Sequence, residues 1–193
     1  MTLYAYSNNG QIFIYDPVFD RFFLEINMSR ELNNPYLSVN NMLVDDQGRL
    51  WIATSAGLYR YDQDHLQQDE NHTSPCRYIE WYDHDRIWVT EDSGLTIYNL
   101  STSVDETIIS KKPPDNYTVC KLYYDQSADR LWIGTLFNGL FFLDPAMEPK
   151  SIVNIPGIPR QPILAIEQVS EHTMMAGIDG QGIWEIDSKT GDI

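Results

Sequence analysis

Short runs of alternating apolar and polar residues recur along the chain, and turn-forming residues separate them. The clearest case begins at Gly48 and reads as a hairpin: a strand centred on Trp51, a turn that ends at Gly57, and a second strand that closes at Asp62. This alternation predicts β-strands, whereas no window shows a helical period of useful length. The pattern therefore predicts an all-β protein.

The hairpin is repeated. Trp88 and Trp132 stand in close copies of it, and Leu3 and Met175 take the anchor position in weaker copies near the two ends. The anchors are roughly 40 residues apart, and about four short strands fit each repeat, as in a β-propeller blade. We therefore predict a β-propeller of four-stranded antiparallel blades, about five in number. Their approximate bounds, within a single propeller segment over 1–193, are 1–27, 39–70, 77–110, 118–155 and 162–193.

The first and last predicted blades are incomplete. The first begins at its second strand, and the last stops after its third. Propellers commonly close by pairing strands from both termini, and these two partial blades do not supply a matching set. We therefore expect a segment of a larger propeller. Between the first two blades, Met28 to Ser38 is polar and contains Asn33-Asn34-Pro35, so it is expected to be a loop.

The composition limits the classes of partner that the chain is expected to bind. The formal net charge is −15, and such a field repels phosphate backbones, so nucleic acid and anionic membranes are poor candidates. Cys76 and Cys120 have neither metal-ligand nor redox spacing, and their disulfide status stays open. The first residues lack a signal-peptide pattern, and no apolar run is long enough to span a membrane. If the parent protein is exported or anchored, those signals lie outside this chain.

The repeat resembles a known family. Val39 to Thr54 followed by Gly57 to Asp62 is similar to the two-component regulator propeller repeat, and Tyr123 to Asp144 is a second close match. The resemblance implies the sensor region of hybrid two-component histidine kinases of Bacteroides-type bacteria. It implies a periplasmic, membrane-anchored sensor of carbohydrate fragments, whose remaining blades and signalling domains lie outside this chain.

The repeated residues are interpreted as structural. A ring recurring at one place in each repeat fills the space between blades, and a repeated glycine sets the geometry of a turn. Thr54, Thr90 and Thr135 are expected to bond local backbone groups near that turn. The structural set is Trp51, Trp88, Trp132, Gly57, Gly94, Gly139 and Gly182.

Catalytic and metal motifs are not apparent. Aspartates recur in one turn of each repeat, at Asp45, Asp83 and Asp125, but without the alternating ligands of a calcium loop, so hydrogen-bonded turns are expected. The four histidines show no ligand spacing and are expected at the surface. No catalytic residue, metal or cofactor is predicted.

A ligand is expected at the loops of one propeller face. These are the turns between second and third strands and the connections between blades. Aromatic faces beside amides and carboxylates suit sugars. The candidate ligand-binding residues are Glu91, Asp92, Phe137, Asn138, Asp179, Gln181, Tyr36, Tyr117 and Arg160.

Three functions stay open. The first is a non-catalytic sensor module that binds an oligosaccharide. The second is a protein-interaction scaffold, in which unpaired outer strands hold a partner or form a homodimer. The third is a propeller enzyme, for which replacing Glu91, Asp92 and Asp179 by alanine would have to abolish an activity; the sequence suggests none.

Overall fold

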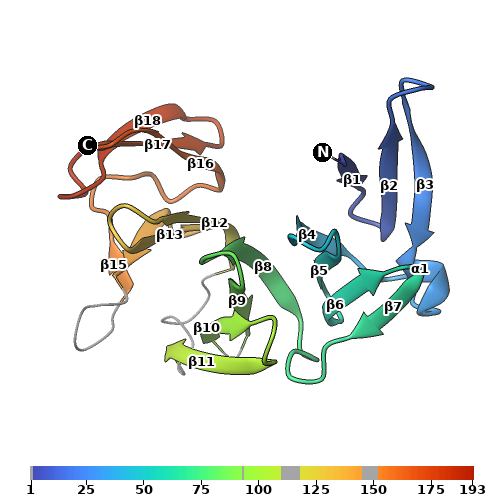
Figure 1. The fold of residues 1–193 in the computed structure, drawn as a ribbon. Coiled ribbons are helices and arrows are strands. Elements are labelled where there is room, and N and C mark those ends of the chain that lie inside the picture. The colour runs from blue at the N-terminus through green and yellow to red at the C-terminus, as the bar shows by residue number, and fades with distance from the viewer. Residues whose placement is uncertain (1, 93, 110–117, 145–151) are drawn as a thin grey trace. The chain divides into compact units, whose positions relative to one another are not determined.

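A computed structural model describes residues 2–92, 94–109, 118–144 and 152–193. Its regular structure is nearly all β-strand, which confirms the predicted all-β class. The strands form five antiparallel sheets in which consecutive strands are neighbours (Figure 1). In chain order they are β1 (Tyr4–Tyr6), β2 (Gln11–Asp16), β3 (Arg21–Asn27), β4 (Val39–Val44), β5 (Leu50–Thr54), β6 (Gly57–Asp62), β7 (His65–Gln68), β8 (Cys76–Trp81), β9 (Arg86–Glu91), β10 (Gly94–Asn99), β11 (Val104–Ile109), β12 (Val119–Asp125), β13 (Arg130–Thr135), β14 (Leu140–Leu143), β15 (Ile152–Asn154), β16 (Ile163–Ser170), β17 (Thr173–Ile178) and β18 (Gly182–Asp187).

Each sheet is an antiparallel meander of the propeller-blade type. The second, third and fourth sheets are β4–β7, β8–β11 and β12–β15, with four strands each. The first and last, β1–β3 and β16–β18, have three strands among the described residues. This arrangement confirms the predicted β-propeller fold of four-stranded antiparallel blades.

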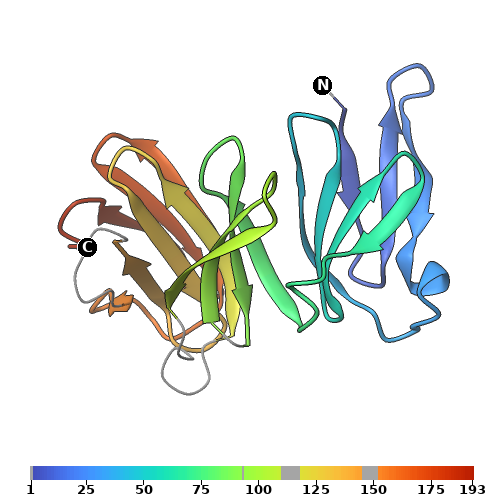
Figure 2. The ribbon, with the colours of Figure 1, turned by 60° about the horizontal axis from the view of Figure 1, so that its bottom comes forward.

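The chain divides into two compact units (Figure 2). Unit 1 is Met1–Cys76 and holds the first two sheets. Unit 2 is Arg77–Ile193 and holds the last three. Each unit has its own apolar core, formed where the face of one sheet packs against the next.

In unit 1, Leu50 and Ile52 of β5 pack with Ile12 of β2 and Tyr4 of β1. The residue of β1 that points into the core is therefore Tyr4. The expectation that Leu3 is the anchor is wrong: its side chain is 50% exposed. A shift of one residue moves a strand side chain to the opposite face, and the weak first repeat did not fix that register.

In unit 2, two aromatic anchors lie between sheets. Trp88 of β9 is fully buried in a cluster with Leu122 of β12 and Leu131 of β13. Trp132 of β13 is fully buried in a cluster with Met174 of β17. Both rings therefore fill space between neighbouring sheets and are not available to stack on a sugar.

The segment between the first two sheets is not only a loop. It contains one helical turn, α1 (Met28–Glu31). The Asn27 side chain accepts a hydrogen bond from the Arg30 amide, which caps the helix, and Met28 is buried in the core of unit 1. A four-residue helix is too short to give a periodic signal, so the sequence analysis missed it.

Candidate functional site

The turn between the second and third strands is tied to the inner strand in the same way in three sheets. In each, the first residue of the turn donates its amide to the carbonyl just before the inner strand. The bonds are Ser55 to Ser38 at 2.9 Å, Leu136 to Thr118 at 3.0 Å and Asp179 to Pro162 at 2.9 Å. The predicted ligand-binding turns are therefore held by the backbone, whatever their side chains.

Threonine hydroxyls fix two of these turns. Thr54 Oγ1 donates to the Gly57 carbonyl at 2.7 Å, and Thr135 Oγ1 donates to the Gly139 carbonyl at 2.8 Å. Both are the local bonds that the sequence predicted. Thr90 differs, because its hydroxyl bonds the amide and carbonyl of Tyr78 on the neighbouring strand, at 2.9 and 3.0 Å.

The linker between the last two sheets joins two turns. Gly139 has a φ of +78°, and a Cβ built on it would lie 3.1 Å from the Pro159 carbonyl oxygen. At the far end of the linker, Pro162 accepts the Asp179 amide. The linker therefore passes from the β13–β14 turn to the β17–β18 turn.

This path brings five predicted residues to one end of two neighbouring sheets, and we call them the turn site. Phe137 is 64% exposed, and Arg160, Asp179 and Gln181 are exposed, whereas Asn138 is half-buried. The turn site consists of Phe137, Asn138, Arg160, Asp179 and Gln181. Its side chains are an apolar ring, a guanidinium, a carboxylate and two amides.

Backbone bonds order the polar members of the turn site. The Asn138 amide donates to Thr135 Oγ1 at 3.0 Å, and the Gln181 amide donates to the Ile178 carbonyl at 3.0 Å. The Gln181 carbonyl accepts the indole N–H of Trp184 at 3.2 Å. Trp184 is half-buried beside this turn and was not predicted, because it lies outside the repeat position of the other anchors.

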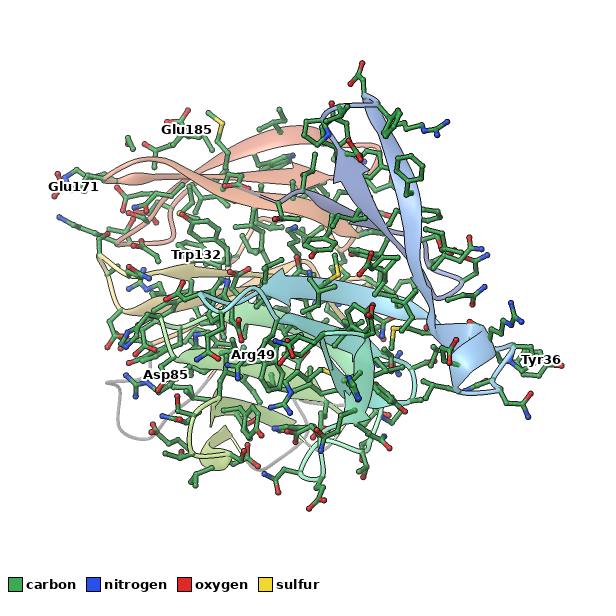
Figure 3. All side chains as sticks on the ribbon, turned by 45° about the vertical axis from the view of Figure 1, so that its right-hand side comes forward. Tyr36, Arg49, Asp85, Trp132, Glu171 and Glu185 are labelled. Carbon is green, nitrogen blue, oxygen red and sulfur yellow. The ribbon has the colours of Figure 1, made fainter. Side chains whose placement is uncertain are left out.

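The other predicted ligand residues lie elsewhere. Glu91 ends β9, and Asp92 of the following turn forms an exposed ion pair with Arg77, at 3.4 Å. Tyr36 belongs to unit 1, is 90% exposed and points into solvent (Figure 3). Tyr117 lies outside the described residues.

The recurrent turn aspartates accept hydrogen bonds from their own turns. Asp45 Oδ1 accepts the amides of Gln47 and Arg49, both at 2.9 Å. Asp45 Oδ2 accepts Arg49 Nε at 2.6 Å and the Trp51 indole at 3.0 Å. Burial alone would raise the pKa of Asp45, but these bonds hold that pKa below its ordinary value.

The other two aspartates are used in the same way. Asp83 Oδ1 accepts the Asp85 amide at 3.0 Å, and Asp125 Oδ1 accepts the Ser127 amide at 2.9 Å. These bonds confirm the interpretation as hydrogen-bonded turns. Within the described residues, no group of three or more His, Cys, Asp or Glu side chains could hold a metal ion.

One histidine departs from the prediction of surface positions. His72 is 1% exposed, and its carbonyl accepts the Leu58 amide at 2.9 Å. Its backbone lies so close to Gly57, whose φ is +117°, that a Cβ there would be 2.5 Å from the His72 carbonyl. The polar neighbours of His72 in the sequence concealed this packing.

Charged side chains also meet on the inner strands of unit 2. Glu80 of β8 interacts electrostatically with Lys121 of β12 and with Glu167 of β16. The pKa of Glu80 is raised to about 7, chiefly by burial and to a smaller extent by Glu167, while the hydrogen bond from the Trp81 amide and the charge of Lys121 oppose the shift. Lys121 also lies over the Tyr78 ring, with its Nζ 5.4 Å from the centroid. The sequence analysis missed this group because its members are distant in the sequence.

Neither cysteine is part of a disulfide. Cys76 is buried in unit 1, and Cys120 Sγ lies 3.1 Å from the Ile163 carbonyl in unit 2. Burial raises the pKa of Cys120 to about 11, which keeps the thiol protonated and unreactive at neutral pH.

Comparisons with known proteins agree with the repeat. A family model described as two component regulator propeller matches residues 34–56. A search of curated proteins found no match.

In the described part of the chain, no helix has both the length and the apolar character that crossing a bilayer requires.

The chain is similar to several solved structures. It matches the extracellular domain of the putative hybrid two-component system BT3049 from B. thetaiotaomicron with a TM-score of 0.68 and 15% identity, over 97% of this chain and 26% of that one. A second match is the extracellular domain of the putative one-component system BT4673 from the same organism, with a TM-score of 0.61 and 23% identity, over 80% of this chain and 21% of that one.

A computationally designed protein, Ika8, matches with a TM-score of 0.66 and 9% identity, over 95% of this chain and 54% of that one. At such identities the likeness shows the fold. The chain spans about a quarter of the length of the BT3049 extracellular domain that it matches. Residues 34–56 match the model of the two-component regulator propeller repeat, which the sequence resemblance predicted, and the fold of the chain is similar to that of the extracellular domains of BT3049 and BT4673.

Proposed function

We propose that the chain is a non-catalytic, ligand-sensing propeller module of the extracytoplasmic region of a two-component sensor. Its ligand is a carbohydrate fragment, and its place is the periplasm, as part of a membrane-anchored receptor with further blades and signalling domains. The turn site carries this proposal, because it presents an exposed ring among hydrogen-bonding groups at the end of two sheets. The similarity to extracellular sensor domains supports it.

The chemistry of the turn site suits a sugar. The face of Phe137 can stack on the C–H face of a pyranose, and the side chains of Asp179, Gln181 and Asn138 can bond ring hydroxyls. Arg160 supplies further donors for a hydroxyl or a carboxylate. The backbone bonds of both turns hold these groups in place before a ligand arrives, which reduces the entropy cost of binding.

Signalling requires more than binding. A sugar can shift a receptor between two states only by binding one of them more tightly, and a tenfold difference in affinity corresponds to about 1.4 kcal/mol. The linker that connects the two turns offers a route from ligand binding to such a shift, because a ligand on the turn site would contact both of the last two sheets.

The test is isothermal titration calorimetry of the chain with a panel of neutral and acidic oligosaccharides. Phe137→Ala should weaken the binding of a hit about fivefold, since a stacked ring contributes about 1 kcal/mol. Phe19→Ala is the matched control, because Phe19 in unit 1 is also 64% exposed, and it should leave affinity unchanged. Equal losses in both variants, or no heat with any sugar, would contradict the proposal.

The non-catalytic assignment is tested in parallel. Each sugar is incubated with the chain and recovered, and we expect it to be intact. Cleavage that Asp179→Ala abolishes would overturn the assignment in favour of a propeller enzyme. Glu91, Asp92, Tyr36 and Tyr117 stay predicted ligand contacts, and alanine at each would show whether they contribute.

A further inference from the structure

The outer strand of the first sheet has apolar side chains exposed on both faces. β3 is paired only with β2, so its second edge is free of any strand among the described residues (Figure 1). Phe22 is 44% exposed, Phe23 36% and Leu24 53%. Phe22 lies against Tyr15 on one face, with ring centroids 5.3 Å apart, whereas Phe23 lies under the Arg21 guanidinium on the other, at 4.4 Å.

Strands at sheet edges are usually protected against pairing. Common protections are charged side chains, above all Lys, Pro on the edge, short length, or a bulge that twists the edge away. β3 is seven residues long and contains neither Lys nor Pro. Its one bulge lies at Glu25, between the pairs Leu24–Phe13 and Ile26–Ile12. The stretch before the bulge, Arg21–Leu24, is regular, and Arg21 is its one charged residue.

The charges on β3 select one register of self-pairing. In an antiparallel pair related by a two-fold axis, the axis must lie midway between one residue and its own copy, which therefore face each other. With Phe23 at the axis, Phe22 faces Leu24 of the second copy, and Arg21 faces Glu25. The two outer pairs are then opposite in charge, and the three inner pairs are apolar. Cross-strand pairs of both kinds stabilise a sheet.

Two other positions of the two-fold axis, at Phe22 and at Leu24, fit less well. With Phe22 at the axis, Arg21 faces Phe23 and Glu25 faces Phe19. With Leu24 at the axis, Glu25 faces Phe23 and Arg21 faces Asn27. In both cases each charge lies opposite an uncharged side chain, so the cross-strand ion pairs are lost.

We propose that β3 is a homodimerisation edge, at which two copies of this chain pair antiparallel about Phe23 to form a continuous six-stranded sheet. The occupant is a second copy because β3 complements itself in charge. One pair of short strands makes a small interface, so the dimer is weak, and it strengthens when a membrane or a larger assembly concentrates the chains. This proposal is independent of the turn site, which lies in unit 2.

The test is sedimentation of the full chain over a range of concentrations. We expect a reversible monomer–dimer equilibrium that Phe23→Lys weakens at least about tenfold, because two ammonium groups would meet at the axis. Val18→Lys is the matched control: Val18 is 84% exposed in the β2–β3 turn, outside the strand, and its replacement should change the Kd less than about twofold.

Charge reversal tests the register. Arg21→Glu and Glu25→Arg should each weaken the dimer, and the double variant should restore it towards the original Kd. Glu25 accepts a hydrogen bond from Tyr61 at 3.1 Å, so thermal unfolding of each variant must show that unit 1 is still folded. Glu25→Asp, which keeps the negative charge, is the control for this rescue. It should not restore the dimer of Arg21→Glu, whereas Glu25→Arg should.

Three outcomes would overturn the proposal. The first is a chain that stays monomeric at every concentration, which would leave β3 to a different protein. The second is a dimer that Ile183→Glu disrupts and Phe23→Lys does not, because Ile183 is an exposed apolar residue on the last sheet. The third is a double charge reversal that fails to restore a dimer lost in both single variants.

Discussion

The fourth and fifth sheets have the same backbone plan but opposite side-chain chemistry at one row. In the fourth sheet, Trp132 pairs with Tyr123 on one side and Phe142 on the other. In the fifth, the corresponding row is Met175 with Glu167 and Glu185. Trp132 lies between sheets, whereas Glu185 projects from the outward face of the last sheet (Figure 3).

The comparison separates the features that every repeat keeps from those that occur only where a second sheet buries them. Backbone pairing and the turn bond to the inner strand are kept in both sheets. The aromatic row is kept only where a neighbouring sheet covers it: Trp132 is fully buried, while both glutamates of the fifth sheet are exposed. The aromatic anchor therefore serves packing, and the turns serve register.

The largest expected effect is at the anchor itself. Trp132→Ala should lower the free energy of unfolding of unit 2 by about 3–5 kcal/mol, because it leaves a cavity between two sheets. Met175→Ala, at the same place in the half-exposed row, should cost less than about 1 kcal/mol. Chemical denaturation measures both. Equal losses would mean that the outward row of the fifth sheet is also packed.

The second effect is a pH dependence carried by the inner-strand charges. The pKa of Glu80 in the folded chain is about 7, above its ordinary value of 4.5. Between these two pH values, Glu80 is therefore protonated in the folded chain and ionised in the unfolded chain. Stability from this group is therefore largest below about pH 4.5 and falls as the pH rises through about 7, by about 3 kcal/mol in total.

Glu80→Gln removes this titration. The difference in unfolding free energy between the two chains should grow in favour of the variant from pH 5 to pH 8. Asp45 and Asp83, whose pKa values are lowered, titrate at more acidic pH and are common to both chains, so they cancel in the difference. A difference that is flat with pH would show that Glu80 ionises freely.

The third effect uses two glycines at the same strand position. A Cβ on Gly134 of the fourth sheet would lie 2.8 Å from Ile163 Cβ, whereas a Cβ on Gly177 of the fifth would lie 3.5 Å from its nearest neighbour. Gly134→Ala should therefore cost about 1–3 kcal/mol by overpacking. Gly177→Ala should be neutral or stabilise by up to about 1 kcal/mol, as thermal unfolding would show.

The smallest effect is at the turn hydroxyl. Thr135→Val leaves the Gly139 carbonyl and the Asn138 amide without their Oγ1 partner, and should cost about 1–2 kcal/mol. Thr173→Val, at the half-exposed start of β17, is the control and should stay within about 0.5 kcal/mol of the parent. If both variants lose equally, the turn does not depend on its threonine.

The strong repeats could be predicted because several signals coincided in each. Trp132, Thr135 and Gly139 recur at the spacing of the second hairpin, and alternation, turn chemistry and period all indicate the same element. The first repeat lacks the tryptophan, so only alternation was left, and the anchor was set at Leu3 in place of Tyr4.

The candidate site was predictable only in part. The turns at Phe137 and Asp179 follow from the repeat, because a turn keeps its place even when its residues change. The path of the linker past Gly139 depends on packing that no local pattern encodes. Glu80, Lys121 and Glu167 meet because three inner strands lie side by side, which is a property of the fold and not of any one segment.

The most direct measurement is a titration of the isotope-labelled chain with an oligosaccharide, followed by backbone amide NMR shifts. If the turn site binds sugar, the shifts will gather in the turns at Phe137–Asn138 and Asp179–Gln181 and at Arg160, and Phe137→Ala will weaken them together. Shifts confined to other loops, or no shifts at millimolar sugar, would contradict the assignment of the turn site as the sensor's ligand contact.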